Sequence, residues 1–214
     1  HVRSRRQRQM CIRDRRNTSV TWYLDSQCTS KVETDNNGLP ITGIFSDLDL
    51  YAKPKTFIIK GSVSMFSNEF NDLIPDTDTS VVFTDEIMPA SATLIDVDAD
   101  GNEGVVAWMD GETMKVSSQV SGQKVVAASD SSFMFAQKES LSLINFSNLD
   151  FYNVTNMDSM FFAASGLTSL DLTPLNTSNV TNMGDVFSNC INLTNLDLSS
   201  FKTNKVCLLY TSDA

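Results

Sequence analysis

Three carboxylates at alternate positions form the pattern in this sequence that most directly suggests ion chemistry. Asp96, Asp98 and Asp100 precede Gly101. Oxygen ligands at alternate positions, followed by a glycine turn, are how a calcium-binding loop begins. The twelfth position of such a loop should supply a bidentate glutamate, but here it is Ala107. The sequence therefore predicts an acidic hairpin turn first, a weak calcium site as the alternative, and no other cofactor.

The two ends of the sequence share an unusual relationship. Residues 8–14 read RQMCIRD and residues 207–214 read CLLYTSDA. One DNA element, read on its two strands, encodes both peptides, and this element resembles the transposon end used to fragment DNA for sequencing libraries. We interpret residues 1–15 and 207–214 as adapter artefact rather than as a natural basic arm. We expect the gene to continue past both ends of this sequence.

Without those ends the chain is strongly acidic and poor in catalytic side chains. Leaving out six arginines and two aspartates reduces the chain to 10 basic and 24 acidic residues, with no histidine. This charge argues against nucleic acid as a partner. The absence of histidine excludes Ser–His and Cys–His catalytic pairs, and Cys28 and Cys190 do not make a disulfide framework. We expect no enzymatic activity in this chain and, since long apolar runs are missing, no membrane span.

A repeat of 26 residues occupies the C-terminal third. The run NVTNM occurs at 153–157 and again at 179–183, and the run LDL occurs at 170–172 and again at 196–198. Apolar residues stay in phase with these runs: Phe135, Phe161 and Phe187; Leu141, Leu167 and Leu193; Ile144, Leu170 and Leu196; Val154, Val180 and Val206. One copy buries too little apolar surface to offset its ordering entropy, so the copies are expected to stack.

Each copy is expected to contain a short helix and a short strand. Valine, methionine and phenylalanine in NVTNMxxxF lie three or four residues apart, which predicts a helix with an apolar face. Alternating leucines in LxxLxL predict a strand with the leucines facing inward. The outward positions of these strands are our candidate partner-binding residues: Asp171, Thr173, Asp197 and Ser199. The expected fold class is α+β, with a β-rich N-terminal part followed by a short leucine-rich-repeat solenoid.

The residues before the repeats predict strands and turns. Val20–Tyr23 and Leu48–Tyr51 are strand candidates in a small β module at 16–55, and Pro54 marks a boundary. The segment 56–130 is expected to be β-rich and to cap the repeats at 131–206. Within it, Val105–Trp108 and Met114–Val116 flank an Asp-Gly turn and predict a hairpin. Further strand candidates are Phe57–Ile59, Val81–Phe83 and Lys124–Ala127.

These runs resemble two kinds of bacterial module. Residues 131–206, with LTSLDLTPLNTSNVTNM, resemble surface proteins that carry BspA-like leucine-rich repeats, although Val186 departs from the usual Met-Phe pair. Residues 17–55 resemble part of an internalin-type B-repeat, a β-grasp-like module. The resemblance implies an extracellular, cell-wall-attached protein that binds a host or neighbouring-cell surface protein or glycan without catalysis. A structural stalk and an accessory region of a secreted hydrolase are the alternatives.

Overall fold

The computed structural model describes residues 20–23, 51–54, 56–64 and 66–208. The chain divides into two units, His1–Lys55 and Thr56–Ala214. In the first unit, β1 (Val20–Tyr23) pairs antiparallel with β2 (Tyr51–Pro54), so the strand predicted at Val20–Tyr23 is confirmed. The rest of the predicted B-repeat module, residues 1–15 and most of the predicted strand at Leu48–Tyr51 lie outside the described residues.

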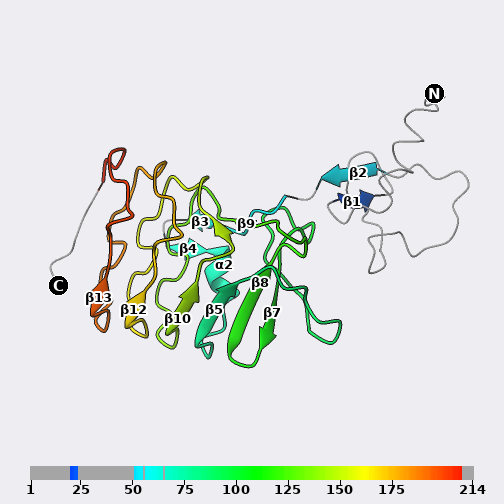
Figure 1. Ribbon diagram of the computed structural model, residues 1–214, viewed down its shortest axis with the longest axis horizontal. Coiled ribbons are helices and arrows are strands. Elements are labelled where there is room, and N and C mark those ends of the chain that lie inside the picture. Colours follow the sequence, from blue (N-terminus) through cyan, green and yellow to red (C-terminus); the bar gives the residue numbers. More distant parts are fainter. Residues whose placement is uncertain (1–19, 24–50, 55, 65, 209–214) are drawn as a thin grey trace, which may run out of the picture. The chain divides into compact units, whose positions relative to one another are not determined.

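A five-stranded sheet forms the first part of the second unit (Figure 1). The strand order is β10-β5-β8-β7-β6, and β5 pairs in parallel with both of its neighbours. The hairpin predicted around the Asp-Gly turn is confirmed, with Gly111 at a φ of 64°. The strands are β5 (Ser80–Phe83), β6 (Ile95–Asp96), β7 (Val106–Asp110), β8 (Thr113–Ser117) and β10 (Leu143–Asn145).

Shorter strand pairs complete the unit. β3 (Ser62–Ser64) pairs with β4 (Ser67–Asn68), and β12 (Ser169–Leu170) pairs with β13 (Asn195–Leu196). The strand predicted at Lys124–Ala127 is β9 (Val125–Val126), and it pairs in parallel with β11 (Leu149–Asp150). At Phe57–Ile59 the chain makes isolated bridges only.

The predicted fold class is wrong, because the repeats contain no helix. Among the described residues, the single α-helix is α2 (Glu69–Asp72), and it lies outside the repeats. The segments 153–161 and 179–187, where helices were expected, consist of turns, irregular backbone and isolated bridges. The molecule is β-rich, so an α+β leucine-rich-repeat solenoid built from strand/helix copies does not describe it.

The backbone hydrogen bonds explain why these segments are not helical. The amides of Met157, Ser159, Phe161 and Ala163 donate to carbonyl oxygens 25 residues further along the chain. The amides of the intervening residues close tight turns, as when Met160 N donates to Met157 O at 3.2 Å. An α-helix would need every amide to donate four residues back. Here alternate amides are used to join one copy to the next.

Left-handed backbone conformations recur at the same two positions of every copy. Ser159 has a φ of 53° and Ala163 has the same value. Their equivalents are also left-handed: Phe133 and Asp185 at the first position, Gln137 and Asn189 at the second. A right-handed helix cannot pass through such residues. None of these six residues is glycine, so the sequence gives no sign of a left-handed backbone at these positions. The spacing of the valine, methionine and phenylalanine residues around them therefore still predicts a helix.

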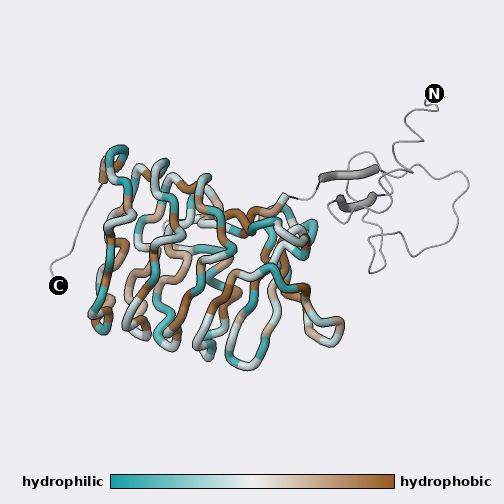
Figure 2. The backbone as a smooth tube through the Cα atoms, in the orientation of Figure 1, coloured by the Kyte–Doolittle hydropathy of each residue, from teal (hydrophilic) through white to brown (hydrophobic). Residues whose placement is uncertain are grey.

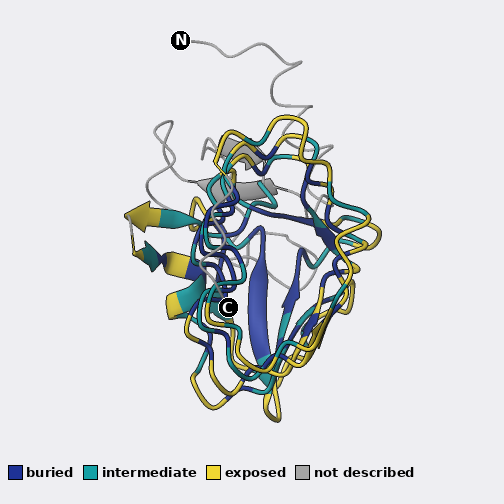
Figure 3. Ribbon diagram, turned by 90° about the vertical axis from the view of Figure 1, so that its left-hand side faces the viewer, coloured by how far each residue is buried: buried dark blue, intermediate teal, exposed yellow. Residues whose placement is uncertain are grey.

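The repeat copies lie side by side as stacked layers, which we name by residues 131–156, 157–182 and 183–208. Single parallel bridges join Asp130, Asn156, Asn182 and Leu208 in sequence, each 26 residues from the last. Inside, the rings of Phe135 and Phe161 stack at 5.7 Å, and those of Phe161 and Phe187 at 5.4 Å. Brown apolar stretches alternate with teal polar ones along each layer in Figure 2. In Figure 3, buried residues run through the interior and exposed residues follow the outline.

Candidate partner-binding surface

In layer 157–182 the strand segment places leucines inside and polar residues outside, as predicted, whereas Leu198 of the next layer is 44% exposed. Leu170 and Leu172 are 8% and 1% exposed, whereas Asp171 and Thr173 between and after them are exposed. Asp197 and Ser199 are exposed at the equivalent positions of the next layer. Since β12 and β13 pair in parallel with Leu170 opposite Leu196, the four candidate residues lie on the same side of adjacent layers.

Each candidate aspartate is fixed by the hydroxyl residue two positions later. Thr173 donates its N–H to the Asp171 carboxylate at 3.0 Å and its hydroxyl at 2.7 Å. Ser199 N–H donates to Asp197 at 2.9 Å. The side-chain hydrogen bond from Thr173, followed by its backbone bond, lowers the pKa of Asp171, and the backbone N–H of Ser199 lowers the pKa of Asp197. Both carboxylates are therefore charged and held in a defined orientation at neutral pH.

The sequence reasoning missed two members of this row, Asn145 and Ser147. Asn145 lies one layer earlier and accepts a hydrogen bond from Ser147 N–H at 2.9 Å, in the same turn geometry. Both residues are exposed. The signal was available, because Asn145 precedes Asp171 by 26 residues and Ile144 was already assigned to the repeat. We call the six residues the outer row: Asn145, Ser147, Asp171, Thr173, Asp197 and Ser199.

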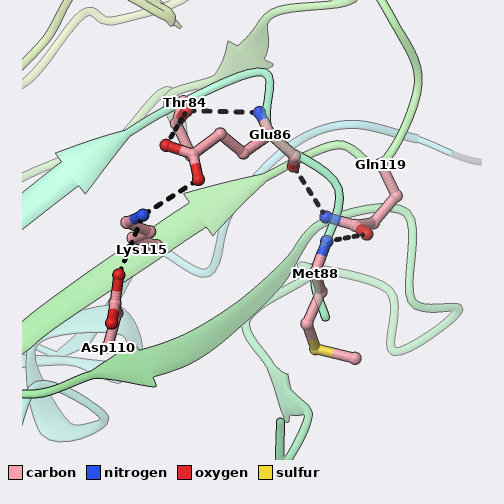
Figure 4. A network of polar contacts seen from close by, with 6 residues as sticks. All are labelled: Thr84, Glu86, Met88, Asp110, Lys115 and Gln119. Carbon is pink, nitrogen blue, oxygen red and sulfur yellow. Dashed lines mark hydrogen bonds and ion pairs between the residues drawn. The ribbon is translucent and has the colours of Figure 1, made fainter. Parts of the chain in front are cut away.

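Beyond Asn145, the five-stranded sheet leads from the outer row to Lys115, whose positive charge is balanced by two carboxylates. Asn145 is opposite Val82, which is opposite Lys115 on β8. Lys115 Nζ lies 2.9 Å from Glu86 and 3.0 Å from Asp110, and these contacts, with the Glu86 hydrogen bond first, raise the pKa of Lys115 (Figure 4). Because two carboxylates share this one ammonium group, it does not offset the negative charge of the outer row.

Gln119 completes the network by holding the loop that follows β5. Its side-chain oxygen accepts the Met88 N–H at 2.8 Å, and its side-chain amide donates to the Glu86 carbonyl at 3.4 Å. Thr84 accepts the Glu86 N–H at 3.2 Å (Figure 4). These bonds fix the base of a loop whose Ile87 is 61% exposed.

The predicted calcium residues lie in one loop, but their oxygens bind the loop's own backbone. The fully buried Asp98 accepts N–H bonds from Asn102 at 3.1 Å and Gly104 at 3.2 Å. Asp96 accepts the Asp98 N–H at 3.0 Å, and Asp100 accepts the Asn102 N–H at 3.3 Å. Within the described ranges, no group of three or more His, Cys, Asp or Glu side chains is arranged to hold a metal ion. The calcium site stays a prediction.

Burial has a marked effect on the central carboxyl group of this loop. It raises the pKa of Asp98 to about 7, and a hydrogen bond and charge repulsion from Asp100 act in the same direction, against the two backbone N–H bonds. Two carboxyl groups that share a hydrogen bond need a proton between them. The Asp98 carboxyl group, with a pKa raised to about 7, therefore titrates close to neutral pH.

A known family model matches the C-terminal part of the chain. Residues 129–211 match a family model described as a Mycoplasma protein of unknown function, DUF285. The match fits the coarser part of the resemblance stated above, a bacterial surface-type repeat protein, and lends no support to leucine-rich or internalin-type repeats. No curated protein and no solved structure matches the chain. None of the helices in the described part of the chain has the length and apolar character needed to cross a membrane.

Proposed function

We propose that this chain is a non-catalytic part of a bacterial cell-surface protein, and that its outer row binds a protein or glycan of a host or neighbouring cell. The observation that carries the proposal is the repetition of one rigid polar turn in three adjacent layers. Asp171 and Asp197 are each exposed, ionised and oriented by a neighbouring N–H. Binding through preformed groups costs little ordering entropy.

The charge of the outer row selects its partner. The carboxylates of Asp171 and Asp197 favour partners that present basic or hydroxyl groups and disfavour anionic partners. Lys115 does not offset their charge, because its ammonium group is already paired with Glu86 and Asp110. An extracellular location and attachment to the cell wall by another part of the protein belong to the same proposal.

The test is binding of the full chain to an immobilised panel of extracellular-matrix proteins and host glycans. The double variant Asp171→Asn and Asp197→Asn should weaken any interaction about tenfold or more, because it removes both charges and keeps the shape. The matched control is Asp72→Asn with Glu139→Gln, two exposed acids outside the outer row. Binding that both double variants reduce equally, or no binding at all, would contradict the proposal.

A further inference from the structure

The hairpin of β3 and β4 presents two large apolar side chains to solvent. Val63 is 62% exposed and Phe66 is 79% exposed. The ring of Phe66 packs edge-on against Phe133, which is half-buried, with the ring centroids 5.8 Å apart and an interplanar angle of 68°. We call Val63, Phe66 and Phe133 the hairpin patch. Exposed apolar side chains that gather in this way mark an interaction surface.

The base of the hairpin is fixed to the first layer, so the patch is a preformed surface. Ser62 N–H donates to the Asp130 carbonyl at 3.0 Å, and the Asn68 side-chain amide donates to the Ser132 carbonyl at 2.8 Å. The hairpin also lies next to α2 (Figure 1). A ligand that binds here therefore loses little affinity to ordering the backbone that carries the patch.

Acidic side chains lie beside the hairpin patch on three backbone segments. Asp130 is placed there by its bond to β3. Glu69 follows β4, and its N–H donates to the Gly61 carbonyl at 3.0 Å. Asp158 belongs to the next layer, and its carbonyl accepts the Phe133 N–H at 3.1 Å. The apolar patch is thus bordered by the carboxyl groups of Glu69, Asp130 and Asp158.

The segments that carry this surface supply no basic residue to balance those carboxyl groups. Residues 61–72, 128–137 and 154–163 contain neither lysine nor arginine. Lys60 precedes the hairpin, but its ammonium group donates to the Asp96 carbonyl at 2.8 Å. The charge around the patch therefore favours a cationic partner and disfavours an anionic one.

The acidic side chains favour a basic peptide over a glycan as that partner. Asp130 Oδ1 accepts the Ser132 hydroxyl at 2.6 Å and the Asn156 side-chain amide at 3.1 Å. Asp158 Oδ2 accepts the Ser159 hydroxyl at 3.1 Å. A glycan would need such oxygens as acceptors for its hydroxyl groups, and these two are already engaged. Their negative charge, in contrast, attracts a cation without a direct hydrogen bond.

We propose that the hairpin patch binds a peptide segment of another protein that carries both aromatic and basic side chains. The aromatic side chains of the segment cover Val63 and Phe66, and its lysine or arginine side chains lie in the field of the neighbouring carboxyl groups. A basic group over the ring of Phe66 adds a cation–π interaction. This surface uses none of the residues of the outer row, so the inference is independent of the proposed function.

Fluorescence anisotropy of the full chain with a labelled peptide of alternating lysine and phenylalanine tests the proposal. We expect saturable binding that Phe66→Ser weakens about tenfold or more, because it removes the exposed ring. The matched control is Ile191→Ser, which replaces an apolar side chain that is 78% exposed elsewhere in the repeats. This control, and the outer-row double variant Asp171→Asn with Asp197→Asn, should bind the peptide like the unsubstituted chain.

Two further peptides separate the apolar contribution from the charge contribution. Replacing every phenylalanine of the peptide by serine, or every lysine by glutamate, should weaken binding about tenfold or more. Glu69→Gln should lower the affinity and reduce its dependence on salt concentration, because it removes one of the carboxyl groups beside the patch.

Four results would overturn the proposal. The first two are no binding at all and binding that Phe66→Ser or the serine peptide leaves unchanged. The third is binding that the outer-row double variant weakens as much as Phe66→Ser does, since the peptide would then respond to acidic charge in general. The fourth is displacement of the peptide by a neutral oligosaccharide such as maltoheptaose, which would assign the patch to glycans instead.

Discussion

Replacing Ala163 by glycine tests whether this residue lies in the observed left-handed turn or in the helix that the sequence predicted. Ala163 has a φ of 53°, a conformation that costs a residue with a Cβ about 1–2 kcal/mol. Glycine adopts it freely but loses more backbone entropy on folding, which offsets about 0.4–1 kcal/mol. The expected net effect of Ala163→Gly is a gain of about 0.5–1 kcal/mol in the free energy of unfolding. In a helix the same change would cost about 1 kcal/mol.

The neighbouring residue provides the control. Ala164 is fully buried and is not among the residues with positive φ. Ala164→Gly should therefore destabilise the chain by about 1 kcal/mol through backbone entropy and lost apolar burial. Urea denaturation followed by circular dichroism measures both variants under the same conditions. If Ala163→Gly lowers the free energy of unfolding as Ala164→Gly does, the left-handed turn is refuted.

Three further outcomes follow from packing and titration. Phe161→Ala should cost about 3–5 kcal/mol and Phe187→Ala clearly less, because Phe161 is stacked on both faces; equal losses in urea denaturation would contradict the stacked core. Gly166→Ala should destabilise the chain by more than 1 kcal/mol, because its Cβ would lie 2.6 Å from the Leu141 carbonyl oxygen, and an unchanged melting temperature would argue against this close approach. Since the folded-state pKa of Asp98 is raised to about 7, its protonated form stabilises the fold below about pH 4. That contribution is lost as the pH rises to 7, so Asp98→Asn should gain stability relative to the unsubstituted chain over this interval, as measured by denaturation at a series of pH values.

The sequence predicted the layers well because their apolar positions carry the periodic information. Phe135, Phe161 and Phe187 do stack at 26-residue intervals, and Asp171 and Asp197 do face outward. Leucines alternate with polar residues because every second side chain is buried, and this pattern can be recognised in a single sequence.

The helical expectation failed because spacing alone cannot report backbone handedness. Val, Met and Phe at intervals of three or four residues suit a helix, and Ser159 and Ala163 give no warning of a positive φ. The deciding interactions are hydrogen bonds to a carbonyl 25 residues away, which no local window contains. Tertiary pairing overrode local preference.

The candidate surface was predicted in part. The pattern located four of the six residues of the outer row, and the same period would have located Asn145 and Ser147. It could not show that Asp98 would be buried with its oxygens on backbone amides, because that geometry depends on left-handed residues such as Gly101 and Glu103.

Alternating amide roles restrict how this chain can change its length during evolution. Between Met157 and Ala164, a single inserted residue would exchange the amides that join layers with those that close turns, and every later bond in that segment would lose its acceptor. Insertions there are tolerable only in pairs or as complete copies of the repeat. Changes in chain length should therefore be limited to duplication of a whole repeat copy and to insertions or deletions in segments that make no hydrogen bond to the adjacent layer.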